Sequence, residues 1–209
     1  MTRSAKAVAA KPAAAKPAAA KGAIRVLPLT PERWDDFETL FGPRGACAGC
    51  WCLWWRIPRS EWTRGKGDGN RRAMRAIVRS GAPTGLLAYA GKTPVGWIAL
   101  APREDTPGLD RSRTLKRLDE KPVWSITCFF VARDYRRQGV TVILLRAAAA
   151  YARKQKVSVL EGYPSEPRKG SVQADAWVFT GVAGAFRKAG FREAARPSET
   201  RRIMRLELR

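Results

Sequence analysis

The sequence predicts an α/β fold, and three features of one stretch carry this prediction. Val123–Val131 is mostly apolar, β-branched or aromatic, which is typical of a strand buried on both faces. A basic turn follows from Ala132 to Gly139, and a second apolar run, Val157–Tyr163, ends the stretch. Between them, apolar residues recur at the spacing of one helix face: Val140, Leu144, Ala147, Ala148 and Tyr151. The stretch is therefore predicted to form a strand, a turn, a helix and a strand.

Length and charge limit the class of protein. The 209 residues are enough for one domain with a substantial core. Lys and Arg total 40 against 18 Asp and Glu, so the formal net charge is +22, which favours polyanionic partners such as nucleic acid or an anionic cofactor. No apolar stretch reaches the roughly 20 residues that cross a bilayer, and the N-terminus has no apolar signal core. Four cysteines do not suggest a secreted disulfide scaffold. We expect a cytoplasmic protein without a membrane contact.

Residues 1–22 differ in composition from the rest of the chain. They repeat Lys-Pro-Ala-Ala-Ala and hold few large apolar groups, so no apolar burial offsets the entropy of ordering them, and we predict disorder. Two interpretations stay open for this tail. It is either a solubilising extension or a weak, non-specific contact for nucleic acid through its lysines. Residues 23–209 are predicted to form the folded domain.

The other elements follow from local patterns. Thr30 and Pro31 are expected to open a short helix, because threonine is a good N-cap and proline suits a first turn. Asn70 is expected to cap a second helix after a flexible loop, Gly65–Gly69. The predicted elements are strand Ile24–Leu29, helix Pro31–Phe41, helix Asn70–Ser80, a hairpin of Gly85–Ala90 and Pro94–Ala101, a helical turn at Arg111–Leu118, helix Ala176–Ala189, and strands Phe191–Arg196 and Arg201–Leu208.

Residues 47–55 combine three cysteines with three tryptophans: Cys47, Cys50, Cys52, Trp51, Trp54 and Trp55. A C-x-x-C pair is a common zinc clip. However, the sequence has no histidine, and the only fourth thiol, Cys128, lies in the central strand. We therefore expect no metal, and expect the cysteines to act as small buried apolar residues. The tryptophans either fill the core or line a substrate pocket.

The turn before the helix at Val140 has the properties of an anion site. Gly139 allows the backbone to approach a ligand closely. The first N–H groups of a helix have no intrahelical partner and carry the positive end of the dipole, and Arg136 and Arg137 add charge. The alternative is an ordinary turn with solvated arginines. Neither the P-loop nor the dinucleotide fingerprint is present.

This turn and its flanks resemble the acyl-CoA-binding segment of the GNAT superfamily of N-acyltransferases. In that family, a strand ending L-x-V leads into [RQ]-x-x-G-x-[GA] at a helix N-terminus. The corresponding residues here are Phe129, Phe130 and Val131, then Arg136, Arg137, Gln138, Gly139, Val140 and Thr141, with Thr141 in place of the usual Gly or Ala. The order of predicted elements over Ile24–Leu208 also resembles that family. The resemblance implies a mixed sheet of six to seven strands, splayed at the central strands and flanked by about four helices.

The resemblance also implies an activity. It implies transfer of an acetyl group from acetyl-CoA to a primary amine of a small molecule or peptide, by direct attack in a ternary complex and without a metal. The turn amides would hold the diphosphate, and backbone groups near Phe129 and Val131 the pantetheine. Trp51, Trp54 and Trp55 would then contact the acceptor. A homodimer that shares a sheet edge stays open. The second interpretation is a non-catalytic acyl-CoA-binding module, associated with nucleic acid through its basic surface.

The acid and base used by many members of that family have no counterpart here. The central strand contains no carboxylate, and Phe186 stands where many members have a tyrosine. Glu161 and Tyr163 are candidates in their place, because residues two apart on a strand point to the same face. Glu161 either serves as a base or pairs with an arginine. Cys128 is a third candidate, as an acyl-carrying nucleophile beside the thioester.

Overall fold

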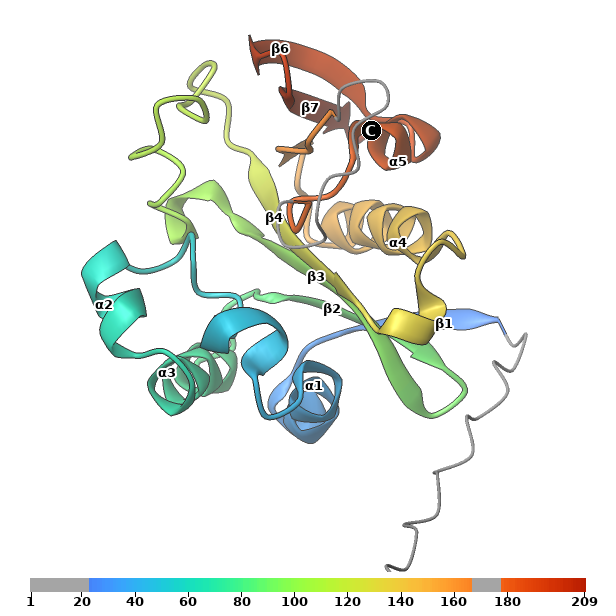
Figure 1. The fold of residues 1–209 in the computed structure, drawn as a ribbon. Helices are drawn as coiled ribbons and strands as arrows, with labels where there is room; N and C mark the ends of the chain where they lie inside the picture. The colour runs from blue at the N-terminus through green and yellow to red at the C-terminus, as the bar shows by residue number, and fades with distance from the viewer. Residues whose placement is uncertain (1–22, 167–177) are drawn as a thin grey trace, which may run out of the picture.

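A seven-stranded mixed sheet, in the order β1-β2-β3-β4-β5-β7-β6, organises the described part of the chain (Figure 1). This computed structural model describes residues 23–166 and 178–209. The strands are β1 (Ile24–Pro28), β2 (Gly85–Ala90), β3 (Thr93–Pro102), β4 (Trp124–Val131), β5 (Val159–Gly162), β6 (Arg192–Ser198) and β7 (Arg201–Glu207). The α-helices are α1 (Trp34–Phe41), α2 (Arg59–Arg64), α3 (Asp68–Arg79), α4 (Val140–Lys154) and α5 (Ala183–Lys188). The predicted α/β class with a mixed sheet is confirmed.

Helices cover both faces of this sheet, which gives the domain two large apolar clusters. Figure 1 shows α4 and α5 on one side and α1, α2 and α3 on the other. Successive side chains of a strand point to opposite faces. Ile98 of β3 accordingly packs against α4, and its neighbour Trp97 packs against α1. Strands β2 and β3 are therefore buried on both sides and hold the two layers together.

The splay predicted for the central strands is present between β4 and β5. These strands run parallel and pair over three positions only, the last of which joins Ile126 to Gly162. Strand β5 ends there, whereas β4 continues to Val131. The register of β3 against β4 shifts between Ala99 and Leu100, next to the point where the strands part. A bulge of this kind bends a strand and increases its twist.

The expected cap at Asn70 is wrong. Helix α3 already begins at Asp68, and Asn70 lies inside it with 1% of its side chain exposed. Its Nδ2 donates to the carbonyl oxygens of Gly49 (3.0 Å) and Trp62 (3.1 Å). Asn70 therefore joins the Cys-rich segment to α2, a helix that the sequence pattern did not predict.

Two further predictions needed correction towards the C-terminus. No helical turn forms around Arg111–Leu118, where the chain follows an irregular path. The helix predicted at Ala176–Ala189 begins only at Ala183, because Gly181 has a left-handed φ of +86° and the preceding residues pair with other segments. Its first two predicted residues, and the tail 1–22, lie outside the described residues. No helix of the described ranges is long and apolar enough to cross a membrane.

Candidate functional site

The turn before α4 presents a run of backbone N–H groups. Arg137 and Gly139 have φ values of +60° and +79°. Within residues 23–166 and 178–209, none of the N–H groups of residues 137–141 donates to another protein group. A side chain built on Gly139 would meet no atom within 4 Å, so this corner is open. Arg136 fixes the turn to the end of β4, because its Nε donates to the Val131 oxygen at 3.0 Å.

The edge of β4 next to this turn is partly covered by the chain itself. The N–H of Phe129 donates to the carbonyl oxygen of Phe179 at 2.6 Å. The same segment is held on its other side, since the Ser165 N–H donates to the Gly181 oxygen at 2.9 Å. The backbone around residues 179–181 therefore bridges the parted ends of β4 and β5. It occupies a donor that the family resemblance assigns to pantetheine.

Glu161 and Tyr163 lie together, as predicted, but inside a sealed ionic network. The carboxylate of Glu161 is 1% exposed and contacts Arg103 Nη1 at 3.0 Å and Arg205 Nε at 2.7 Å. The Tyr163 hydroxyl donates to Glu161 Oε1 at 2.8 Å and contacts Ser125 Oγ at the same distance. Burial and the charge of Glu161 raise the pKa of Tyr163. This geometry favours the ion-pair alternative for Glu161.

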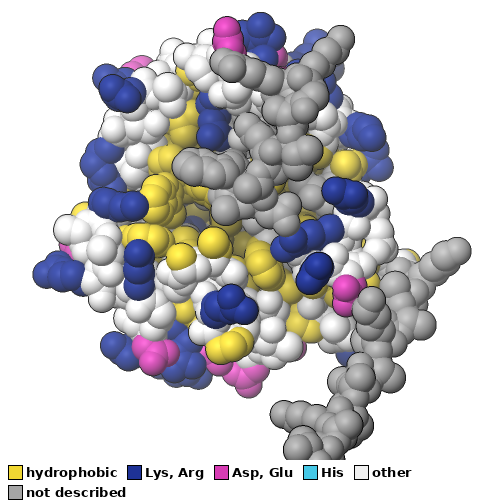
Figure 2. Space-filling model, viewed as in Figure 1, with side chains coloured by type: hydrophobic (Ala, Val, Ile, Leu, Met, Phe, Trp, Pro, Cys, Tyr) yellow, Lys and Arg dark blue, Asp and Glu magenta, His cyan; other side chains and the backbone are white. Residues whose placement is uncertain are grey.

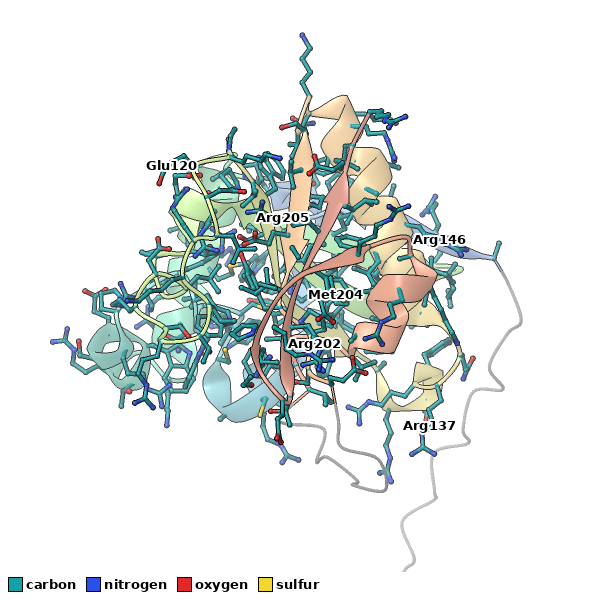
Figure 3. The ribbon with its side chains drawn as sticks, turned by 90° about the horizontal axis from the view of Figure 1, so that it is seen from above. Glu120, Arg137, Arg146, Arg202, Met204 and Arg205 are labelled. Atoms are coloured by element: carbon teal, nitrogen blue, oxygen red, sulfur yellow. The ribbon has the colours of Figure 1, made fainter. Side chains whose placement is uncertain are left out.

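Sequence patterns did not reveal the two arginines of this network. Arg103 follows β3, is 1% exposed, and also contacts Asp110 at 2.7 Å. Arg205 lies on β7 and also binds Asp119. Figure 3 shows Arg205 over the middle of the sheet and Arg137 at the margin beside the turn, so the network and the turn are separate features. Among 40 basic residues, no local signal distinguishes these two.

The Cys128 thiol lies in a group of thiols rather than beside a base. Its Sγ donates to the Phe129 oxygen at 3.8 Å and interacts with Cys52, whose Sγ accepts a hydrogen bond from Trp97 Nε1 at 3.0 Å. The interaction with Cys52 and burial raise the pKa of Cys128 well above its ordinary value, and burial raises that of Cys50. A nucleophilic cysteine needs the thiolate, so these surroundings oppose that role. Among the described residues, no three Cys, Asp or Glu side chains are arranged to hold a metal ion.

The reactivity of the four thiols should follow their exposure to solvent. With 5,5'-dithiobis(2-nitrobenzoate) at pH 7.5, we expect Cys47, the exposed thiol, to react first and the other three more than about tenfold more slowly. Cys47→Ser should remove the fast phase, whereas Cys128→Ser should leave it intact. A fast phase that survives Cys47→Ser and disappears with Cys128→Ser would show an activated thiol in β4.

The three tryptophans have different environments. Trp51 is 4% exposed and stacks against Trp34 and Phe41, so it fills the core. Trp54 is partly exposed, and the Arg59 guanidinium lies 3.6 Å from its ring centre. Trp55 packs against the small cluster around Tyr163, at the end of β5. Trp51 also lines a cavity together with Glu38, Pro43 and Arg71, so the pocket-wall interpretation stays open for all three tryptophans.

The described residues thus form an α/β protein with a mixed sheet. Its strands β4 and β5 separate next to the N-terminus of α4. The chain belongs to the acetyltransferase (GNAT) family, because the family model matches residues 51–171, more than half of the sequence. The predicted family is confirmed. No protein of curated function matches the sequence.

Solved structures with the same fold include aminoglycoside acetyltransferase AAC(6')-Ib in complex with coenzyme A and kanamycin. It is 14% identical, with a TM-score of 0.52, over 88% of this chain and 95% of that chain. The complex of AAC(6')-Ib with ribostamycin and coenzyme A is 15% identical, with a TM-score of 0.53, over 88% and 93%. N-acetyltransferase from Staphylococcus aureus Mu50 is 11% identical, with a TM-score of 0.51, over 90% and 100%. At these identities the similarity concerns the fold.

Proposed function

We propose that this protein transfers an acetyl group from acetyl-CoA to a primary amine of a small molecule or peptide, by direct attack in a ternary complex. The observation that carries the proposal is a run of N–H groups at residues 137–141, at the start of the 15-residue helix α4, that have no hydrogen-bond partner among the described residues. Such a terminus binds phosphate through its donors and its dipole. Arg136 and Arg137 add positive charge there. The structures of AAC(6')-Ib bound to coenzyme A, which have the same fold, support the choice of ligand.

The pantetheine arm would extend from this turn along the edge of β4 beyond its pairing with β5. An extended ligand can add to an exposed strand edge through main-chain hydrogen bonds. Phe129 and Val131 lie two apart on β4, so their N–H groups face the same edge. Because the Phe179 carbonyl oxygen holds the Phe129 N–H, acyl-CoA must displace the backbone around residue 179 to use that donor. The released N–H would then polarise the thioester carbonyl.

The reaction itself places few demands on side chains. The neutral amine nitrogen attacks the thioester carbon, the C–S bond breaks, and the proton lost by nitrogen passes through water to the departing thiolate. A thiol with a pKa of about 8.5 leaves without an acid, so the phenylalanine at position 186 does not prevent transfer. Placing amine and carbonyl at attack distance supplies much of the acceleration. Glu161 and Tyr163, which are fixed in the ionic network, have no assigned step in this proposal.

Displacement of the chain around residue 179 gives a measurable prediction. In hydrogen–deuterium exchange, we expect acetyl-CoA to increase exchange in a peptide covering residues 178–182, because displacing this segment from β4 opens the turn in which the Gly181 N–H donates to the Val178 oxygen at 2.8 Å. Strand β5 should exchange as before, since it stays paired with β7. Increased protection of residues 178–182 on binding would contradict strand addition at Phe129 and would place the pantetheine elsewhere.

Calorimetric titration with acetyl-CoA and a thiol-release assay over a panel of amines test the proposal. We expect binding and steady, amine-dependent release of CoA. Binding without turnover on any amine would favour the second candidate, a non-catalytic acyl-CoA-binding module. The observation in its favour is that Phe186 replaces a tyrosine while Glu161 is sealed by two arginines. Cytoplasmic location, a homodimer, and weak nucleic-acid contact through residues 1–22 stay predictions. The nucleic-acid contact can be tested by retention on immobilised DNA. It predicts retention that weakens with salt and that is lost when residues 1–22 are deleted.

A further inference from the structure

The side of β4 that faces α1 provides an apolar wall next to the proposed thioester position. Phe129 and Val131 pack towards α4, whereas Cys128 and Phe130 pack towards α1. The ring of Phe130 lies 5.5 Å from that of Phe41. The cluster that contains these side chains is made of aromatic, aliphatic and thiol groups. An acceptor that reaches the thioester from this side therefore meets an uncharged surface.

One apolar cluster joins this wall to a cationic and aromatic rim. Cys50, Cys52 and Cys128 belong to this cluster, and so do Trp54 and Trp62. The guanidinium of Arg59, in α2, lies 3.6 Å from the ring centre of Trp54 and 4.8 Å from that of Trp62. The wall thus ends at a guanidinium that lies over two indoles, which meet edge to face with their ring centres 4.9 Å apart.

This guanidinium is available to an anion. Among the described residues, no carboxylate lies within 4.0 Å of Arg59 or of Lys66, whose Nζ lies 5.0 Å from the ring centre of Trp62. A guanidinium that stacks on an aromatic face keeps its in-plane N–H groups for a carboxylate or phosphate. In Figure 2, hydrophobic side chains gather in the hollow at the middle of this face and Lys and Arg side chains surround them. Most of the visible acidic side chains lie at the margins.

Four carboxylates of the neighbouring strands and loops are already paired with arginines. Glu161 is held by Arg103 and Arg205. Glu166, which follows β5, pairs with Arg187, and with Arg202 at 3.7 Å. Asp110 and Asp119 pair with the same two arginines that hold Glu161. At these four carboxylates, a second ammonium group on an acceptor would have to displace an arginine.

We propose that the acceptor is an aromatic primary amine that also carries an anionic group, and not a polycation. This inference rests on the proposed acetyl transfer. The amine would lie at the free end of β4, the ring along the wall of Cys128, Cys52 and Phe130, and the anionic group at Arg59. The kanamycin and ribostamycin of the AAC(6')-Ib complexes, which carry several amines, would be poor acceptors for this enzyme.

Three para-substituted benzylamines test this class, since they share the ring and the reacting amine and differ in one group. They are 4-(aminomethyl)benzoate, benzylamine and p-xylylenediamine, with kanamycin as a fourth probe. We expect kcat/KM to fall in that order, with about a tenfold preference for the benzoate over the diamine. Arg59→Gln should reduce the ratio of benzoate to benzylamine turnover to about one. Arg64→Gln, an exposed arginine of the same helix, should leave that ratio as in the wild type.

The outcomes separate the two proposals. A preference for p-xylylenediamine or kanamycin, or a benzoate ratio unchanged by Arg59→Gln, would overturn the acceptor class and leave acetyl transfer standing. Absence of CoA release with all four probes would overturn the acceptor class, and absence with every amine of the wider panel would overturn acetyl transfer as well.

Discussion

Gly139→Glu is expected to abolish binding of acetyl-CoA, with the dissociation constant rising at least about 100-fold. No atom lies within 4 Å of a Cβ at this position, so the new side chain can extend into the space before α4 without a clash. Its carboxylate would occupy the proposed diphosphate position and accept the same backbone donors. It would also repel a ligand of the same charge. Calorimetric titration at fixed ionic strength measures the loss.

Gly81→Glu is a closely matched control. Gly81 has the same φ of +79°, is exposed, and would likewise have no atom within 4 Å of an added Cβ. Both substitutions therefore impose the same left-handed strain on a glutamate, but Gly81 follows α3, away from the turn. Gly81→Glu should bind acetyl-CoA as the wild type does. Equal affinities in the two variants would show that residues 137–141 do not hold the ligand.

The central unit of the fold could be predicted because its signals are local. The buried strand and the helix at Val140 were placed to within one residue at their first positions, since apolar periodicity and a glycine turn determine both. The hairpin of β2 and β3 follows for the same reason. The open turn at residues 137–141 was also predictable, because its N–H groups belong to consecutive residues. These features need no knowledge of distant contacts.

Elements that depend on distant contacts were predicted less well. Helix α2 contains one buried residue, Trp62, and so shows no apolar stripe. Asn70 has a good capping side chain, but its two buried bonds to Gly49 and Trp62 decide its position. The apolar residues before α5 were assigned to the helix, whereas pairing of Phe179 with β4 and of Gly181 with Ser165 holds them in a turn outside it. At Asn70 and in the segment before α5, tertiary hydrogen bonds override the local preference.

The partners of Glu161 also could not be predicted from the sequence, because they lie far from it along the chain. The spacing on β5 correctly placed Glu161 and Tyr163 on one face, where their side chains are hydrogen-bonded. The partners that occupy the carboxylate, Arg103 and Arg205, are 58 and 44 residues away in the sequence. No periodicity links residues at such separations, so the choice between base and ion pair required the structure.

Glu161→Gln is expected to lower the free energy of unfolding by about 3–5 kcal/mol. The amide keeps the shape of the side chain but removes the charge that compensates Arg103, which is 1% exposed, and Arg205. A buried charge without its partner is strongly destabilising. Urea denaturation measures the change, and Glu104→Gln is the control, because its pair with Arg117 is at the surface and contributes less than about 1 kcal/mol.

Kinetics of the same variant distinguish a structural carboxylate from a catalytic one. If the network only holds the loop after β3 against β5 and β7, folded Glu161→Gln should keep the affinity for acetyl-CoA and show a modest loss of kcat that does not change with pH. A base would give a different pattern, in which the variant is as stable as the wild type and the rise of kcat with pH disappears. Because the two arginines and Tyr163 already use both oxygens of Glu161, we expect the first pattern.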